Sequence, residues 1–316
     1  MDISIIIPLY NEEESVPHLI EWIERVMSAH GYSYEIIMIN DGSNDSSWEV
    51  IESLGKKNAS IRGICFQRNY GKSAALHCGF QMAQGDIVIT MDADLQDSPD
   101  EIPGLYKMIK YKNYDLVSGW KKKRYDNTLT KNIPSKIYNA TARKISGVKL
   151  HDMNCGLKAY RKDVVKSIEV YGEMHRYIPI IAKWSGFYNI GEKVVEHRAR
   201  QYGKTKFGFN RFIHGYLDLL TIMFISKFRK SPMYFFGTVG SLMFFLGFLA
   251  IIWLGVHKIY CVSKGILAIL VTNNPYFYIA LTAMILGTQL FLAGFLAELI
   301  SRNSSERNNY LINKTI

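Results

Sequence analysis

Short apolar runs and amphipathic stretches alternate through the first hundred residues. Apolar positions recur at helical spacing between Val16 and Val26, and a second helix is expected around Ser47–Leu54. The run Ile87–Met91 does not alternate with polar residues, which is typical of a strand buried on both faces of a sheet. The strands expected from the apolar runs cover Ile3–Ile7, Tyr34–Ile39, Ile61–Phe66 and Ile87–Met91. Strands that alternate with helices in this way predict an α/β fold with a parallel, wound sheet.

Polar residues follow each of these predicted strands. Open α/β sheets bind their ligands at the carboxyl ends of the strands. The loops that begin at Pro8, Asn40, Arg68 and Asp92 are therefore expected to gather around one site.

The last third of the chain is dominated by two long uncharged runs. Ser231–Val256 contains no charged residue, and a second run continues to Ala297, with Asn274-Pro275 as its expected helix start. Each run exceeds the roughly 20 apolar residues that a membrane-spanning helix needs. We therefore expect a hairpin of two transmembrane helices, at about 233–256 and 276–299, joined by a short connection that contains Lys258 and Lys264.

Basic residues flank both apolar runs on the same side. They are Lys227, Arg229 and Lys230 before the first run, and Arg302 and Arg307 after the second. The positive-inside rule then places the amino-terminal domain and the carboxy terminus in the cytoplasm. The helical stripe from Phe212 to Met223 is interpreted as an interfacial helix, with packing against the globular domain as a comparable alternative.

Composition narrows the choice of partner. Lys and Arg number 38 against 28 Asp and Glu, and a formal charge of +10 suits nucleic acid, an anionic membrane or phosphate-bearing substrates. The segment 121–149 holds nine basic residues and one acid, and is interpreted as a basic amphipathic helix at a membrane rather than a solvated charged face. It lacks the interleaved aromatic residues of a nucleic-acid platform. The four cysteines include no CxxC pair, which disfavours a zinc site, and the start of the chain lacks a signal-peptide pattern.

Two carboxylates follow the strand predicted at Ile87–Met91. Asp92 and Asp94 flank one small residue, and they point to the same side if the extended geometry persists. Burying two unpaired carboxylates is costly, and a divalent cation removes that cost. The alternative is a solvated acidic turn. Asp41 and Lys72 also have two interpretations each: Asp41 contacts a nucleoside or caps a turn, and Lys72 neutralises phosphate or lies on the surface.

Four motifs occur in order along the chain: Ile7-Pro8-Leu9-Tyr10-Asn11-Glu12, Asn40-Asp41-Gly42-Ser43, Arg68-Asn69-Tyr70-Gly71-Lys72 and Asp92-Ala93-Asp94-Leu95-Gln96. Together they resemble glycosyltransferase family 2, and within it the polyprenyl-phosphate glycosyltransferases, the group of dolichol-phosphate mannose synthase and bactoprenol glucosyltransferase. The resemblance extends over essentially the whole chain. It implies a GT-A-like fold, with Mg²⁺ or Mn²⁺ on Asp92, Asp94 and Gln96. It also implies that the nucleotide sugar is bound by Pro8, Tyr10, Glu12, Asp41, Lys72 and Asp92.

Two later segments extend this resemblance. Asp152, within His151–Gly156, matches a family Asp beside the donor sugar and acceptor, which makes Asp94 and Asp152 the candidate catalytic residues. A phosphate acceptor is already anionic near neutral pH, so Asp152 either positions the reactants or the metal or acts as a base, with turn capping as the alternative. Arg200–Phe207 resembles the family's Arg-x-x-Gly-x-Ser-Lys-aromatic element, with Thr205 and Phe207 as mild departures. The residues assigned to phosphate binding are Arg124, Arg200 and Lys206.

The sequence thus predicts a membrane-bound, metal-dependent, inverting glycosyltransferase. The expected donor is UDP-glucose or a related UDP-hexose, and the expected acceptor is a polyprenyl phosphate such as undecaprenyl phosphate, at the cytoplasmic face of the inner membrane. The absence of the Gln-x-x-Arg-Trp element of processive synthases favours one sugar per cycle. The alternatives are a transferase of the same fold with another lipid or protein acceptor, and a non-catalytic membrane scaffold that binds a nucleotide sugar.

The expected organisation has four parts. They are a catalytic domain over 1–208, an interfacial helix over 209–230, two spanning helices within 231–300 and a cytoplasmic tail over 301–316. Nucleic acid is not an expected partner, and self-association through the spanning helices is a further expectation.

Overall fold

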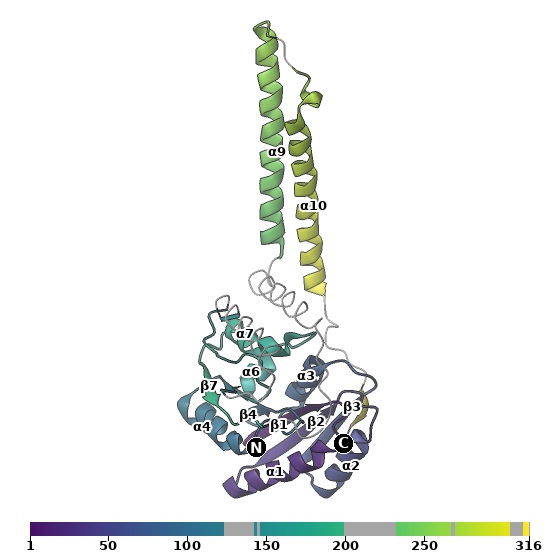
Figure 1. Cartoon of the computed structure of the whole chain (residues 1–316), viewed down its shortest axis with the longest axis vertical. Helices are drawn as coiled ribbons and strands as arrows, with labels where there is room; N and C mark the ends of the chain where they lie inside the picture. Colours follow the sequence, from purple (N-terminus) through teal and green to yellow (C-terminus); the bar gives the residue numbers. More distant parts are fainter. Residues whose placement is uncertain (123–141, 144–145, 199–231, 267–268, 304–311, 316) are drawn as a thin grey trace. The chain divides into compact units, whose positions relative to one another are not determined.

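The computed structural model describes residues 1–122, 142–143, 146–198, 232–266, 269–303 and 312–315 (Figure 1). The chain divides into two units: Met1–Met223 together with Asn308–Ile316, and Phe224–Arg307. The first unit holds the sheet, and the second holds two long apolar helices.

A mixed sheet organises the first unit, with its described strands in the order β7-β5-β6-β4-β1-β2-β3-β8. The strands are β1 (Ile3–Leu9), β2 (Tyr34–Asn40), β3 (Ile61–Phe66), β4 (Ile87–Thr90), β5 (Leu116–Trp120), β6 (Lys158–Arg161), β7 (Ile190–Val194) and β8 (Ile312–Thr315). β1 pairs in parallel with β2 and β4, and β2 pairs in parallel with β3. The four strands expected from the apolar runs are therefore confirmed, as is the wound α/β fold class.

Two strands run against the others. β6 is antiparallel to both β4 and β5, and β8 is antiparallel to β3. The alternation of strands and helices predicts a parallel sheet and does not reveal these two short strands. The connection from β5 to β6 begins and ends at the same edge of the sheet, so the returning strand must run in the opposite direction.

Helices cover both faces of the sheet (Figure 1). α1 (Ser15–His30), α2 (Ser47–Lys57) and α4 (Ile102–Lys112) share a core with Ile3, Ile5 and Ile7. α3 (Lys72–Met82) packs on the opposite face, where the absence of a side chain at Gly79 leaves room for Ile6 and Ile39. Because successive residues of a strand point to opposite faces, β1 is buried from both sides. The shorter described helices of this unit are η1 (Pro99–Glu101), α6 (Lys162–Ser167), η3 (Met174–Tyr177) and α7 (Ile178–Trp184).

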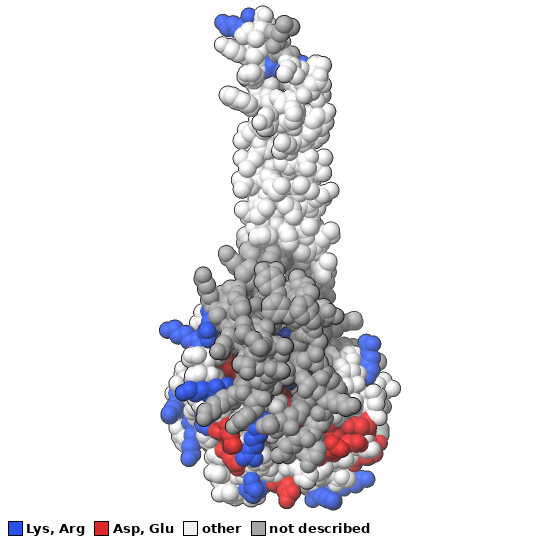
Figure 2. All heavy atoms as spheres, in the orientation of Figure 1, with Lys and Arg blue, Asp and Glu red and all other residues white. Residues whose placement is uncertain are grey.

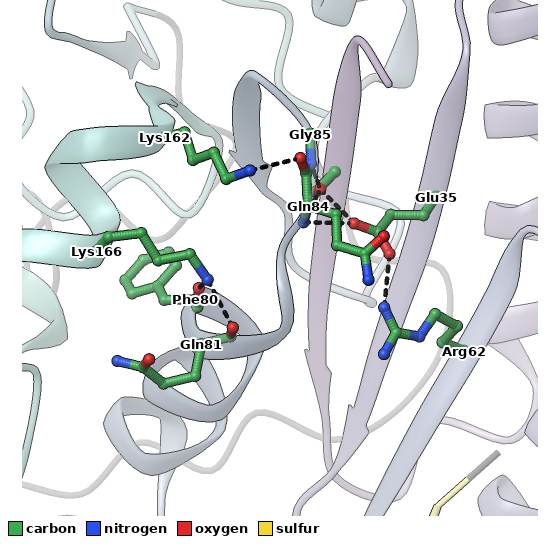
Figure 3. A network of polar contacts seen from close by, with 9 residues as sticks. Glu35, Arg62, Phe80, Gln81, Gln84, Gly85, Lys162 and Lys166 are labelled. Atoms are coloured by element: carbon green, nitrogen blue, oxygen red, sulfur yellow. Dashed lines mark hydrogen bonds and ion pairs between the residues drawn. The ribbon is translucent and has the colours of Figure 1, made fainter.

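A polar network anchors the carboxyl end of α3 at the edge where the parallel strands begin (Figure 3). The buried carboxylate of Glu35 accepts hydrogen bonds from Ser4 Oγ (2.6 Å) and the Gln84 amide (2.7 Å), and pairs with Arg62 (3.0 Å). Two lysines of α6 donate to carbonyl groups at and after the end of α3; these bonds join Lys166 to Phe80 and Gln81, and Lys162 to Gln84. The network satisfies carbonyl groups that a helix end leaves without intrahelical partners. The opposite end of α3, which begins with Lys72, is thereby held at a fixed distance from this edge.

The second unit contains α9 (Pro232–Ser263), η4 (Val271–Asn273) and α10 (Pro275–Asn303). α9 and α10 pack closely as a hairpin. A Cβ added at Gly240 would lie 2.5 Å from the carbonyl oxygen of Gly287, and one added at Gly247 would lie 2.5 Å from that of Ala280. Small residues that let two helix backbones approach in this way are typical of helix pairs in membranes.

Both helices contain a span that is long and apolar enough to cross a membrane, Met233–Ser263 and Pro275–Ala297. Their outer surface in the drawn view is uncharged along most of its length (Figure 2). Lys258 lies on α9, because that helix continues to Ser263, so the expectation that Lys258 belongs to the connection between the helices is wrong. A helix of 32 residues is about 48 Å long, which exceeds the ~30 Å of a bilayer's hydrocarbon core. The end of α9 that carries Lys258 therefore has the length to reach beyond the hydrocarbon.

Candidate active site

The candidate site is built on loops that leave the carboxyl ends of β1, β2 and β4. Leu9 is in register with Asn40, and Ile6 with Thr90, so these three strands end at one edge of the sheet. The loops after β1 and β2 are joined by hydrogen bonds: the Asn11 amide donates to Ser43 Oγ, and the Glu12 amide donates to Ser47 Oγ. Among the predicted nucleotide-binding residues, Pro8 lies within β1, and Tyr10 and Glu12 follow that strand, all three partly exposed. The Glu12 carboxylate accepts from Ser15 Oγ, at 2.8 Å, at the start of α1.

Asp41 connects the loop after β2 to the loop after β3. Its buried carboxylate accepts hydrogen bonds from the backbone amides of Tyr70 (2.7 Å) and Gly71 (2.9 Å). Burial raises the pKa of Asp41, and these two amide bonds oppose that rise. Gly42 lies so close to the second loop that an added Cβ would be 2.7 Å from Arg68 Cα. These bonds join two loops rather than cap the turn at Asp41, and they fix the residues that precede Lys72. A contact of Asp41 with the nucleoside stays a prediction.

Lys72 is the first residue of α3, and its ammonium group forms an ion pair with Asp92. Both side chains are about one-third exposed. Burial raises the pKa of Asp92, but the positive charges of Lys72, Lys121 and Lys158 outweigh it and lower the pKa to about 2. The two sequence expectations for Lys72, phosphate binding or a free surface position, both miss this contact with Asp92.

The segment Asp92–Gln96 departs from the extended geometry of β4. The strand ends at Thr90, the chain bends over residues 93–95, and Leu95 has a positive φ of 59°. The expectation that Asp92 and Asp94 point to the same side assumed that the strand continues through both residues, and it does not. Asp92 remains partly exposed, whereas Asp94 is buried and its carboxylate accepts a hydrogen bond from the Gln96 amide at 3.2 Å.

The loop Asp152–Leu157 closes the site from the side of β6. Three side chains donate to its carbonyl groups: Ser118 Oγ to Asp152 (3.3 Å), Lys158 Nζ to Cys155, and Thr90 Oγ1 to Gly156 (2.9 Å). Asp152 itself is buried, and its carboxylate accepts from the Asn154 amide at 3.1 Å, which is the turn-capping role weighed above. The loop backbone lies close to Asp92, because a Cβ added at Gly156 would be 2.5 Å from Cγ of Asp92.

Two lysines that the motifs do not single out complete the charge of the site. Lys158 is fully buried on β6; burial lowers its pKa, while Asp152 and Asp92 act in the opposite direction. Lys121 follows β5 and pairs with the buried Asp97 at 2.6 Å. Lysine is rarely buried without a charged partner. A lysine flanked by apolar residues in the sequence therefore indicates a buried, paired lysine. Leu157 and Ala159 flank Lys158 in this way.

The candidate donors for a divalent cation are Asp92, Asp94 and Gln96, which lie in one loop after β4. Within the described part of the chain, no group of three or more His, Cys, Asp or Glu residues is arranged to hold a metal. Carboxylate and amide oxygens are the hard donors that Mg²⁺ prefers, and Mg²⁺ usually takes one or two carboxylates and completes its shell with water and substrate phosphates. The partly exposed Asp92 fits such a site, in which a diphosphate supplies the remaining oxygens.

The three residues assigned to phosphate binding, Arg124, Arg200 and Lys206, lie outside the described residues. The structure does place the residues just before Arg200. His197 forms an antiparallel bridge with Asp97, and the Arg198 amide donates to the Gln96 carbonyl at 2.9 Å. The segment that ends at Arg198 therefore lies against the loop that carries the metal candidates.

Comparisons with known proteins agree with this geometry. The model of the family "Glycosyl transferase family 2" matches residues 4–169. The chain is 34% identical over 304 residues to dodecaprenyl-phosphate galacturonate synthase of Rhizobium johnstonii, a match that covers 96% of this chain and 88% of that protein. It is 33% identical over 306 residues to undecaprenyl-phosphate 4-deoxy-4-formamido-L-arabinose transferase of Pseudomonas aeruginosa, with coverage of 96% and 86%.

Solved structures support the fold. The glucosyl-3-phosphoglycerate synthase of Mycobacterium tuberculosis, in complex with Mn²⁺ and UDP-glucose, aligns with a TM-score of 0.56 and 18% identity. The alignment covers 71% of this chain and 78% of that one. At this identity the likeness concerns the sheet and its helices.

Proposed function

Because the chain belongs to glycosyl transferase family 2, we propose that it transfers a single sugar from a UDP-sugar to a polyprenyl phosphate. The observation that carries the proposal is the packed group of Lys72, Asp92 and Gly156, which brings three loops together at the carboxyl edge of the sheet. The same chain contains two helices that are able to span a membrane. This combination fits an enzyme with a water-soluble donor and a lipid acceptor. Both relatives carry a polyprenyl phosphate in their names.

Each loop has a proposed part in donor binding. The loops after β1 and β2, with Pro8, Tyr10, Glu12 and Asp41, surround the nucleoside. Lys72 shifts from Asp92 toward the diphosphate when the donor binds, because two phosphate groups offer more negative charge than one carboxylate. Asp92, Asp94 and Gln96 hold Mg²⁺ or Mn²⁺, which when bound stabilises the negative charge of the leaving diphosphate.

The proposed reaction is a direct displacement. A phosphate oxygen of the acceptor forms a bond to the anomeric carbon, and the bond from that carbon to the β-phosphate oxygen breaks and releases UDP. Asp152, held by its loop carbonyl and by the Asn154 amide, orients the acceptor phosphate and the sugar; a phosphate monoester needs little help from a base at neutral pH because its second pKa is about 6. The displacement inverts the configuration and gives a β-linked product from an α-linked donor.

The donor is proposed as a UDP-sugar, and the relatives widen the choice beyond glucose. Their names refer to galacturonate and to 4-deoxy-4-formamido-L-arabinose. A screen for this chain therefore includes UDP-galacturonate and UDP-4-deoxy-4-formamido-L-arabinose beside UDP-glucose.

The proposed location is the inner membrane, with the catalytic unit and the carboxy terminus in the cytoplasm. The described helices α9 and α10 form the spanning hairpin, and the catalytic domain and interfacial helix keep the bounds predicted from the sequence. The predicted tail over 301–316 is revised, because α10 continues to Asn303 and Ile312–Thr315 forms β8, which pairs with β3. An interfacial site brings donor and lipid phosphate together and limits the search to the membrane plane.

The experiment is transfer by the purified full chain in lipid nanodiscs that contain undecaprenyl phosphate, with each labelled donor in turn. At least one donor is expected to label the lipid, and Asp94→Asn is expected to abolish that labelling. Full labelling by Asp94→Asn would contradict the metal role, and a failure of every donor to label any lipid would contradict the acceptor. Arg200→Ala is expected to weaken the use of donor or lipid phosphate, and unchanged kinetics for both would remove it from the site.

A further inference from the structure

Asp97 is a fully buried carboxylate directly after the metal candidates Asp92, Asp94 and Gln96. Its Oδ1 lies 2.6 Å from Nζ of Lys121, whose side chain is 12% exposed. Its other oxygen, Oδ2, has no hydrogen-bond partner among the residues that the structure describes. The single ammonium group of Lys121 is thus the charge that compensates Asp97 in this part of the chain. Neither residue belongs to the set that the sequence motifs assign to the site.

The backbone around Asp97 is held independently of this ion pair. Asp97 forms an antiparallel bridge with His197, and the carbonyl group of the preceding Gln96 accepts from the Arg198 amide at 2.9 Å. The Asp97 carboxylate therefore projects from a fixed backbone position. Lys121 reaches it from the end of β5, a strand that the intervening β6 separates from β4.

Lys121 also lies within electrostatic reach of the metal candidates. Its positive charge is one of the influences that lower the pKa of Asp92, after the larger effects of burial, which raises it, and of Lys72. Burial raises the pKa of Asp97, Lys121 opposes that rise, and the nearby charges of Asp92 and Asp94 add to it. The ammonium group of Lys121 is therefore in direct contact with Asp97, and its charge also acts on Asp92.

We propose that Asp97 is a positioning residue for the metal site, which holds Lys121 away from Asp92 and Asp94 and so leaves their oxygens available to the cation. The inference rests on the proposed function, because it assumes a cation at these residues. It adds a residue whose carboxylate acts through a lysine rather than on the metal. A lysine released from Asp97 is still attracted by the charge of Asp92, and it then competes with the cation for that carboxylate.

A purely structural role for the pair is the competing explanation. Buried ion pairs add little net stability compared with apolar residues of similar size, whereas removal of one partner leaves a costly unpaired charge. A structural role therefore predicts that Asp97→Asn lowers stability and leaves the affinity of the folded protein for a cation unchanged. The positioning role predicts a loss of that affinity, and it predicts that the loss is reversed when the released ammonium group is also removed.

The test measures Mn²⁺ binding to the full chain in detergent, by electron paramagnetic resonance of free Mn²⁺, with saturating UDP to supply the diphosphate oxygens and without sugar donor or lipid. Asp97→Asn is expected to weaken Mn²⁺ binding by about tenfold or more, the range seen when groups that orient metal ligands are changed. The double variant Asp97→Asn/Lys121→Met is expected to return to within about threefold of the original affinity. Glu35→Gln is the matched control, because it also removes the acid of an ion pair with a buried carboxylate, at the opposite edge of the sheet (Figure 3).

The outcomes distinguish a failure of the positioning role of Asp97 from a failure of the metal assignment. Unchanged Mn²⁺ affinity in folded Asp97→Asn would overturn the positioning role, as would a double variant no better than the single one. A reduced affinity in Glu35→Gln equal to that in Asp97→Asn would also overturn it, because a general loss of stability would then explain both. If the unaltered protein binds no Mn²⁺ even with UDP present, the metal assignment in the proposed function fails first. Folding of each variant is checked by its thermal transition, and the double variant, which contains no unpaired charge, supplies the answer if the single one does not fold.

Discussion

Gly156→Ala is expected to disable the site through a displacement of Asp92, while the fold is retained. The new Cβ would lie 2.5 Å from Cγ of Asp92, whereas ordinary contacts begin at 3.4 Å. The carboxylate must therefore retreat by about 1 Å, and a misplacement of that size can lower a rate by about 100-fold. Gly156 has no positive φ, and the atoms in conflict belong to a short side chain rather than to backbone, so alanine is compatible with the chain's conformation. We expect a stability loss of no more than about 1–3 kcal/mol, the usual cost of overpacking.

The assay compares the sugar-transfer rate, Mn²⁺ affinity and thermal transition of Gly156→Ala with those of Gly255→Ala. Gly255 lies in α9 with nothing within 4 Å of an added Cβ, so its replacement tests the same chemical change without a collision. We expect loss of transfer and of Mn²⁺ affinity in Gly156→Ala alone. A folded Gly156→Ala protein with unchanged metal affinity and rate would refute the contact between this loop and Asp92 as a requirement of the site.

Three further predictions follow from individual contacts. Lys72→Met should tighten Mn²⁺ binding by up to about fivefold, because an ion pair this exposed is worth about 1 kcal/mol at most. The same change should weaken UDP binding. If calorimetry shows that the affinities for Mn²⁺ and UDP change in the same direction, this prediction is contradicted. Gly287→Val should separate α9 from α10, because an added Cβ lies 2.5 Å from the Gly240 carbonyl oxygen; an unchanged thermal transition in detergent would oppose it. Burial, and next the charge of Lys72, hold the pKa of His175 well below 6.5. Below pH 6.5 the unfolded chain binds a proton at this histidine and the folded chain does not. The free energy of unfolding should therefore fall by up to about 1.4 kcal/mol for each pH unit below 6.5. Thermal melting at pH 7.5 and 5.5 should show a larger loss of stability in the unaltered protein than in His175→Gln.

Local patterns were sufficient to predict the elements of the first hundred residues. The runs Ile3–Ile7 and Ile61–Phe66 became β1 and β3 because most of their residues are buried, which a short run rich in apolar residues encodes directly. The helical hairpin could be predicted equally well, because length and apolarity decide whether a helix can span a membrane. β6 could not be predicted from the sequence, because it has only four residues and includes a buried lysine, Lys158.

The chemistry of the site was predictable by residue type, and its pairings were not. The motif that contains Asp92 and Asp94 marked the correct edge of the sheet, but nothing local indicates that Lys72, 20 residues earlier, pairs with Asp92. The same is true of Lys121 and Asp97, which tertiary packing brings into contact from different elements. Asp152 illustrates the reverse case, because its loop has local turn signals and its carboxylate does cap the following turn.

The central claim is that a phosphate oxygen of a polyprenyl phosphate attacks the anomeric carbon of the donor, and the mass of the lipid product tests it most directly. Purified protein in nanodiscs would be given undecaprenyl phosphate and the accepted UDP-sugar, and both products would be analysed by mass spectrometry. The account predicts a lipid that carries one phosphorus and one sugar, with UDP released in equal amount. A lipid diphosphate with release of UMP, or hydrolysis of the donor without any lipid product, would contradict it.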